Sequence, residues 1–137
     1  MREVIAALDT GLGAITLFTE DLAATAGFYR DVFGLAPLFE DDSSAVFRFG
    51  ATVLNVLQAD AAPELIEPAP VGGPDAGRRV QLTVWVEDTD AVCAQLREHG
   101  VALLNGPVDR PWGKRTAAFA DPGGHVWEVA QDLPRPS

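Results

Sequence analysis

A small set of polar side chains interrupts otherwise apolar, strand-like segments of the chain. Glu128 is the strongest acid–base group of the set. In an enclosed cavity its carboxylate would have a raised pKa and serve as a general base, or it would pair with a cationic group of a ligand. The alternative is a structural carboxylate tied to a neighbouring arginine or backbone amide. Asn55 and Gln81 can hydrogen-bond a ligand or each other, and two hydroxyls accompany them, those of Thr16 and Thr83.

Three aromatic side chains stand near these polar groups. Phe18 follows Thr16 by two residues and Trp85 follows Thr83 by two, so in a strand each pair shares a face. The two rings can form stacking walls for a planar ligand, and a place in the core is the alternative. Trp112 lies on a Pro-Trp-Gly turn, where it can cap the mouth of a cavity or stabilise the turn itself.

The elements that position these residues occur twice along the chain. The segment Gly50–Gln58 reappears as Gly123–Gln131 at an offset of 73, and Leu17–Ala23 reappears as Val84–Asp90 at an offset of 67. Such a repeat indicates a duplicated unit that can enclose a site between its copies. We expect one α+β domain over residues 1–137, with module 1 at about 13–58, module 2 at about 80–131, and a Pro- and Gly-rich linker at 59–79 that is also a mobile flap.

Each module is predicted to have the order β-α-β-β-β. In module 1 the spacing of apolar residues indicates a strand at 14–19, a helix from 21 to a stop at Gly34, and strands near 38–39, 45–49 and 53–57. In module 2 it indicates a strand at 80–86, a helix at 88–99 and strands near 101–104, 116–120 and 125–130. Cys93 and Trp127 are expected in the core.

Alternate side chains of a strand point to opposite sides of a sheet, which divides the predicted strands into two faces. One face is aliphatic, as expected beneath a packed helix: Ile15, Leu17, Leu82, Val84 and Val86. The other face mixes aromatic, small and polar residues: Ala14, Thr16, Phe18, Val53, Asn55, Leu57, Gln81, Thr83, Trp85, Val126, Glu128 and Ala130. Such a mixture is typical of a concave ligand cavity, although a half-exposed sheet face has the same pattern.

The composition narrows the classes of function. Twenty acidic residues against ten basic ones give a net charge of −10, which disfavours nucleic acid and favours a neutral or cationic small ligand, unless the charge only maintains solubility. No apolar run reaches the roughly 20 residues that a membrane span needs. The apolar patch at residues 4–8 is too short for a signal peptide, and a single cysteine forms no intrachain disulfide, so a cytoplasmic location is expected.

Two motifs resemble those of a known family. The stretch Asp21-Leu-Ala-Ala…Phe-Tyr-Arg-Asp-Val-Phe-Gly-Leu35 is similar to the first-module signature of the vicinal oxygen chelate superfamily, and Phe119-Ala-Asp-Pro-Gly-Gly-His-Val-Trp-Glu128 is similar to its closing strand. This superfamily includes glyoxalase I, extradiol dioxygenases, fosfomycin-resistance enzymes and bleomycin resistance proteins. The resemblance spans residues 13–131. It implies paired βαβββ modules that form half-barrels around a cavity, assembled as a homodimer.

The resemblance also implies four positions that hold a divalent metal in the family, and here they are Ala14, Asn55, Gln81 and Glu128. A catalytic metal site needs about three His, carboxylate or Cys ligands. Ala14 has no donor, the two amides are weak ligands, and only Glu128 is a good one. His125 shares the parity of Trp127 and is expected to point away from this face. We therefore expect no metal cofactor, with a weak divalent site at Glu128 and Gln81 left open.

Three functions follow as hypotheses. The leading one is a metal-independent binding protein of the glyoxalase/bleomycin-resistance type, which binds an aromatic or cationic metabolite or an antibiotic through the residues of the mixed face and Trp112. The alternative is an enzyme of lyase, isomerase or dioxygenase type that uses a weak metal site or Glu128 as general base. The third is a partner-binding scaffold whose cavity is filled by packing of Phe18, Phe49 and Trp85.

Overall fold

A computed structural model describes residues 5–8 and 10–135; Val4, the first residue of the apolar N-terminal patch, lies outside them. A short helical turn, η1 (Ala6–Leu8), precedes module 1. This module contains β1 (Ala14–Thr19), α1 (Leu22–Asp31), β2 (Pro37–Glu40), β3 (Ser44–Phe49) and β4 (Thr52–Gln58). The linker carries η2 (Ala59–Ala61) and α2 (Pro63–Ile66). Module 2 contains β5 (Gln81–Trp85), α3 (Thr89–Glu98), β6 (Leu103–Arg110), β7 (Lys114–Ala120) and β8 (Val126–Asp132).

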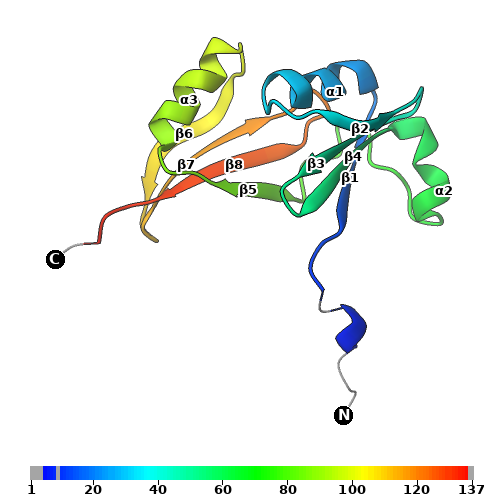
Figure 1. The fold of residues 1–137 in the computed structure, drawn as a ribbon, viewed down its shortest axis with the longest axis horizontal. Coiled ribbons are helices and arrows are strands. Elements are labelled where there is room, and N and C mark those ends of the chain that lie inside the picture. Colours follow the sequence, from blue (N-terminus) through cyan, green and yellow to red (C-terminus); the bar gives the residue numbers. More distant parts are fainter. Residues whose placement is uncertain (1–4, 9, 136–137) are drawn as a thin grey trace.

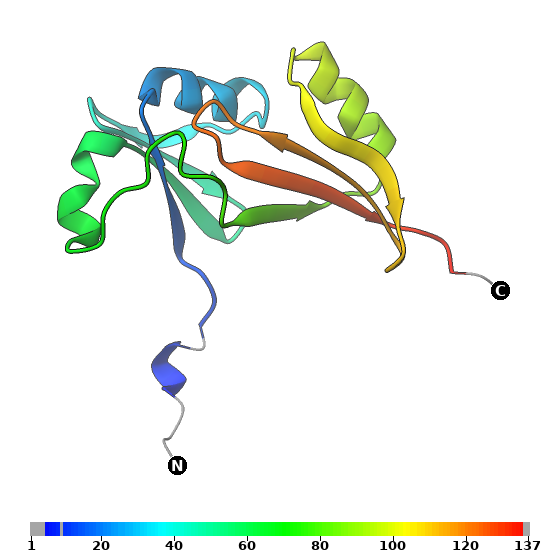
Figure 2. The same cartoon turned by 180° about the vertical axis from the view of Figure 1, so that it is seen from behind.

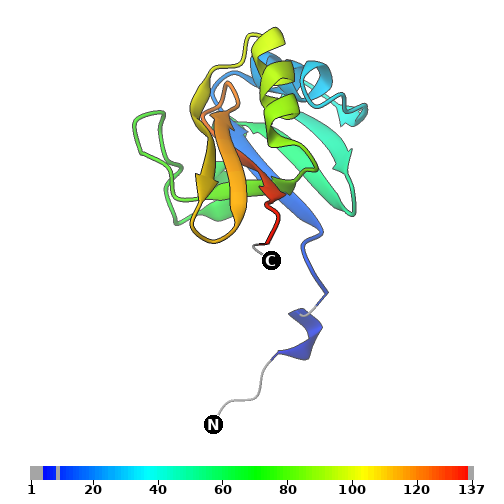
Figure 3. The ribbon, with the colours of Figure 1, turned by 90° about the vertical axis from the view of Figure 1, so that its left-hand side faces the viewer.

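The predicted duplication is confirmed in the topology. Each module forms a four-stranded mixed sheet, with the strand orders β1-β4-β3-β2 and β5-β8-β7-β6. In both sheets the first strand pairs with the last in parallel, while the other pairs are antiparallel. The sheets lie side by side, with α1 and α3 on the same side of them (Figure 1, Figure 2). Figure 3 shows that none of the described helices covers the opposite side and that η1 lies away from the sheets.

Residues at equivalent positions of the repeat form the same hydrogen bonds in both modules. Asp21 accepts a hydrogen bond from the Ala24 amide at the start of α1, and Asp88 accepts one from Ala91 at the start of α3, each at 3.0 Å. These side chains satisfy amides that the first helical turn leaves unpaired. At the end of each last strand, the Gln58 side chain accepts from the Leu22 amide, and the Gln131 side chain accepts from the Thr89 amide. The matched sequence positions therefore mark equivalent contacts between strand and helix.

The structure corrects the expected position of the sixth strand. The predicted strand at 101–104 is observed as β6, which runs from Leu103 to Arg110 through an Asn-Gly-Pro sequence that resembles a turn. Gly106 has a φ of 85°, and a Cβ built on it would lie 2.4 Å from the carbonyl oxygen of Thr116 on β7. Glycine is therefore required for β6 to stay close to β7 at this irregularity.

The core lies between the aliphatic sheet faces and the two helices, and an aromatic cluster extends it across both modules. Cys93 and Trp127 are buried, as predicted, and Tyr29 is buried with them. The ring of Phe33 lies 4.9 Å from that of Trp127, and Tyr29 lies 6.1 Å from the same ring. Tyr29 and Phe33 belong to module 1, whereas Trp127 belongs to module 2. These ring contacts therefore stabilise the packing of one module against the other.

A buried hydrogen-bond chain runs through this cluster. The Tyr29 hydroxyl donates to Oδ2 of Asp121 at 2.5 Å and accepts from Nε1 of Trp127 at 2.9 Å. Asp121 also accepts from the backbone amide of His125 at 2.9 Å. The carboxylate is thus held by donors from both modules, which offsets the cost of burying its charge.

We expect Tyr29→Phe to lower the free energy of unfolding by about 1–3 kcal/mol, because the buried Trp127 N–H and Asp121 carboxylate each lose a partner. Urea unfolding followed by circular dichroism measures this. Thr52→Val is the control, since the Thr52 hydroxyl makes only a 3.4 Å exposed hydrogen bond to Leu12. Equal stabilities of the Tyr29 variant and the parent protein would contradict the assigned role of the hydroxyl.

A second prediction concerns alkaline pH. Burial, and then the charge of Asp121, raise the pKa of Tyr29 well above its ordinary value of 10.0. Above that ordinary pKa the unfolded chain releases a proton that the folded chain retains, so stability falls as pH rises. Phenolate absorbance of this single tyrosine should therefore appear only together with unfolding. The chain in urea, which titrates near the ordinary value, is the reference. Reversible titration near pH 10 in folded protein would contradict the burial.

Candidate functional site

Module 2 brings three predicted site residues together on its open face. The Thr83 hydroxyl donates to Oε1 of Glu128 at 3.0 Å, because the two residues are directly paired between β5 and β8. The Glu128 side chain is partly buried, and its bonding partner is this hydroxyl rather than an arginine. Trp85 lies two residues further along β5 and is 72% exposed, so it is not a core aromatic. Gln81 begins β5 and is exposed.

Module 1 places its predicted residues on the corresponding face. Thr16 on β1 pairs directly with Asn55 on β4. Oδ1 of Asn55 is buried and has no hydrogen-bond partner among the described residues, which leaves a polar atom available to a ligand or a water molecule. Phe18 is half-buried at the same edge of the sheet, whereas Ala14 is exposed and offers no polar group.

Two tryptophans are exposed and lie beside cations. Nζ of Lys114 is 5.2 Å from the centre of the Trp85 ring, and Cζ of Arg110 is 5.8 Å from the centre of the Trp112 ring. Trp112 is 66% exposed on the turn between β6 and β7, and it does not line the cavity that β1 and the linker form. Phe49 packs in the core against Phe33 and Trp127. The packing of Phe18, Phe49 and Trp85 expected for a filled cavity is therefore not observed.

A cavity lies elsewhere, at the seam between the two modules, and we call it the seam cavity. It is bounded by β1, by residues 72–80 of the linker, by Leu82 of β5 and by the turn at residues 123–126. Its volume is about 330 Å³. Thr16 and Phe18 are the two predicted site residues that line it, whereas Glu128, Asn55, Gln81, Thr83 and Trp85 do not.

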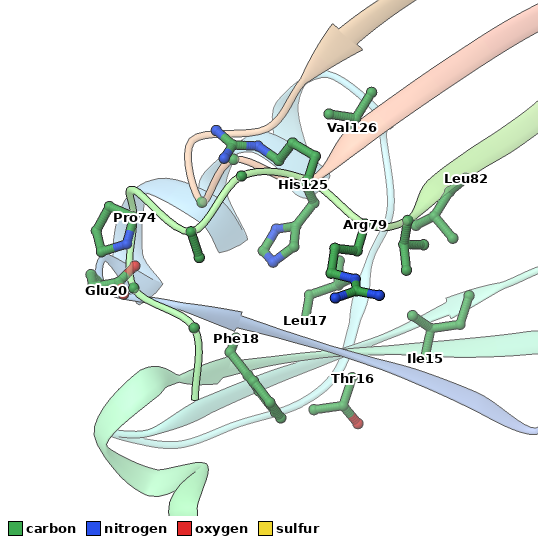
Figure 4. A pocket seen from close by; sticks show the side chains of 18 residues that line it. Ile15, Thr16, Leu17, Phe18, Glu20, Pro74, Arg79, Leu82, His125 and Val126 are labelled. Carbon is green, nitrogen blue, oxygen red and sulfur yellow. The ribbon is translucent and has the colours of Figure 1, made fainter. Parts of the chain in front are cut away.

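Three basic residues that the sequence did not indicate as site residues line the seam cavity: Arg78, Arg79 and His125. Figure 4 shows Arg79 entering from the linker and His125 entering from the turn before β8. Nδ1 of His125 lies 2.8 Å from Oδ2 of Asp121, whose side chain is fully buried. The parity argument treated His125 as part of the last strand, pointing away from the open face, but β8 begins at Val126 and His125 lies in the preceding turn. Parity could not show the cavity, because that cavity exists only where the linker crosses β1.

The residues do not fit a catalytic metal at the positions implied by the resemblance. Within the described part of the chain, no group of three or more His, Cys, Asp and Glu side chains is arranged to hold a metal ion. Oε1 of Glu128 already accepts from Thr83, and Asn55 contributes only an amide oxygen. One carboxylate and weak amide donors do not form the usual set for a divalent metal.

Comparison with known proteins decides the family. Residues 11–129 match the model of the Glyoxalase/Bleomycin resistance protein/Dioxygenase superfamily. The chain belongs to this superfamily. Proteins of the superfamily typically bind small molecules. The described residues contain no helix long and apolar enough to cross a membrane.

Individual relatives agree with this assignment. The chain is 32% identical over 124 residues to the uncharacterized protein YraH of Bacillus subtilis, covering 87% of this chain and 96% of that protein. It is similar in structure to a glyoxalase/bleomycin resistance protein/dioxygenase from Nocardioides, with a TM-score of 0.80, 24% identity, and coverage of 96% and 93% of the two chains. A glyoxalase-related enzyme from Fulvimarina pelagi has a TM-score of 0.75 and 27% identity, with 90% and 88% covered.

The donor set leads to a prediction about metals. Titration calorimetry with Zn²⁺ and with Mn²⁺ should show no binding tighter than millimolar, because Glu128 alone supplies a strong ligand at the family positions. Glu128→Gln serves as the matched control and should leave the calorimetric trace unchanged. A stoichiometric heat of binding that is lost in Glu128→Gln would contradict the prediction and identify a metal site on the open face.

Proposed function

We propose that this protein binds an aromatic small molecule on the open sheet faces without a catalytic metal. The observation that supports this most strongly is the exposed Trp85 ring two residues from the Thr83–Glu128 pair on the same face of β5 and β8. A large exposed ring offers stacking area, and a carboxylate held by a neighbouring hydroxyl offers a fixed polar contact. The occupant is a planar metabolite or antibiotic.

A cationic group on the ligand fits the charges of this site. Glu128 supplies the negative charge, and the net charge of −10 attracts cations at long range. Lys114 already lies over the Trp85 ring and pairs with Asp132. A cationic aromatic ligand would replace the Lys114 ammonium on the ring and place its charge toward Glu128.

A second copy of the chain is proposed to complete the site. Trp85 on the open face of module 2 is 72% exposed. A large apolar ring exposed in this way can be covered by a partner surface. In a homodimer, the open face of module 1 with Asn55 would approach the open face of module 2 with Glu128. The site would then be shared by two chains.

Fluorescence quenching of Trp85 tests the proposal. Trp112→Phe serves as the background, because it removes the other exposed indole while Trp127 stays buried. A panel of cationic aromatic compounds and neutral analogues of equal size is titrated. We expect saturable quenching at micromolar concentrations by a cationic member. Glu128→Gln should weaken the affinity for this cationic compound about tenfold, because the charge-assisted contact is lost, and it should have little effect on the affinity for neutral analogues.

Thr83→Val is the matched control for the hydrogen bond that positions the Glu128 carboxylate. It leaves the Glu128 charge in place and removes its hydroxyl partner, so it should weaken binding less than Glu128→Gln does. Absence of any ligand tighter than millimolar would contradict the binding function. Turnover of a bound compound that is lost in Glu128→Gln at unchanged stability would instead establish the enzyme alternative, with Glu128 as the general base.

A further inference from the structure

The seam cavity shares Thr16 and Phe18 with the open face of module 1, but Asn55, Thr83 and Glu128 do not line it, and its chemistry is different. Arg79 and His125 extend into it (Figure 4). Much of the remaining wall is apolar: Ile15, Leu17, Pro74, Val80, Leu82 and Val126. A volume of about 330 Å³ lies at the lower end of the range for small-molecule pockets. The cavity therefore has room for a compact organic molecule with one polar end.

The hydrogen bonds of His125 determine which ring nitrogen can meet a ligand. Nδ1 lies 2.9 Å from Oδ1 and 2.8 Å from Oδ2 of Asp121. A carboxylate only accepts hydrogen bonds, and this one already accepts from the Tyr29 hydroxyl, so Nδ1 carries a hydrogen. With its hydrogen-bonded Nδ1 held by Asp121, the ring leaves Nε2 as the nitrogen that can contact a ligand, as an acceptor in the neutral imidazole or as a donor in the imidazolium. The ring lines the cavity.

Arg79 supplies a positive charge to the cavity, which Arg78 also lines. Within the described residues its guanidinium forms no ion pair, in contrast to Arg115, which pairs with Asp90 and Asp109. A guanidinium with unused donors binds a carboxylate through two parallel N–H groups. Glu20 also lines the cavity and opposes an anion there, so it offers a way to test the role of charge without disturbing Arg79.

We propose that the seam cavity binds a small organic acid that carries a hydroxyl group beside its carboxylate. Arg79 binds the carboxylate, Nε2 of His125 forms a hydrogen bond with the hydroxyl group, and the apolar walls pack against the rest of the molecule. The polar contacts of this site lie off the open faces that carry Glu128 and Trp85. Its ligand is therefore independent of the function proposed above.

Three probes of nearly equal size test the ligand chemistry. Mandelate has the carboxylate and the hydroxyl, phenylacetate lacks the hydroxyl, and mandelamide lacks the charge. Binding is followed by the backbone amide signals of Gly123, Gly124 and His125 in ¹H–¹⁵N NMR spectra of the full chain. We expect saturable shifts in the order mandelate, then phenylacetate, then mandelamide. Equal affinities of mandelate and mandelamide, or shifts confined to Thr83 and Trp85, would overturn the proposal.

Matched variants test the two side chains. Arg79→Gln should weaken mandelate about tenfold or more, while Arg97→Gln, which removes an equal charge from α3, should have no effect. Glu20→Gln should tighten mandelate about twofold. His125→Asn keeps a side-chain N–H for Asp121 but removes Nε2, so it should abolish the preference for mandelate over phenylacetate at nearly unchanged melting temperature. Retention of that preference, or equal losses in Arg79→Gln and Arg97→Gln, would overturn the assignment.

Discussion

The buried carboxylate of Asp121 is the contact on which the arrangement of the two modules depends. It accepts from the Tyr29 hydroxyl of α1 and from the backbone and ring of His125, and Trp127 of β8 completes the chain of donors. A buried charge is tolerated only while its donors stay in place. The helix of module 1, the turn before β8 and β8 itself must therefore keep one relative position. The orientation of the open faces and the existence of the seam cavity both follow from that position.

The chain combines a superfamily fold with an unusual distribution of chemistry. Its open faces have one carboxylate, two amides and exposed aromatic rings, which suit recognition of an organic molecule better than coordination of a metal. The cavity at the seam is lined by two guanidinium groups, of Arg78 and Arg79, and by one carboxylate, of Glu20. The two regions differ in sign although they lie on one small acidic protein. Net charge alone therefore does not identify the ligands of such a chain.

Much of the fold could be predicted because short stretches of sequence determine the helix caps and the alternation of side chains along each strand. Asp21 and Asp88 are helix-capping residues at equivalent positions of the repeat, and strand parity correctly placed Thr83 beside Glu128 on one face. The course of β6 could not be predicted, since the conformation of Gly106 is stabilised by its contact with β7. The seam cavity could not be predicted either, because it also depends on contacts between distant parts of the chain. It arises where three segments distant in sequence meet, and no local pattern shows that the linker crosses beside His125.

The parallel pairing of first and last strands has a consequence for synthesis on the ribosome. All four strands of the first sheet are complete once Gln58 has been made, so its backbone pairing does not require residues 80–131. The ring contacts of Tyr29 and Phe33 with Trp127, however, can form only after Trp127 has been synthesised, near the end of translation. The nascent chain thus exposes an apolar aromatic surface for most of the time that the second half is being made, when it is most open to aggregation and to chaperones.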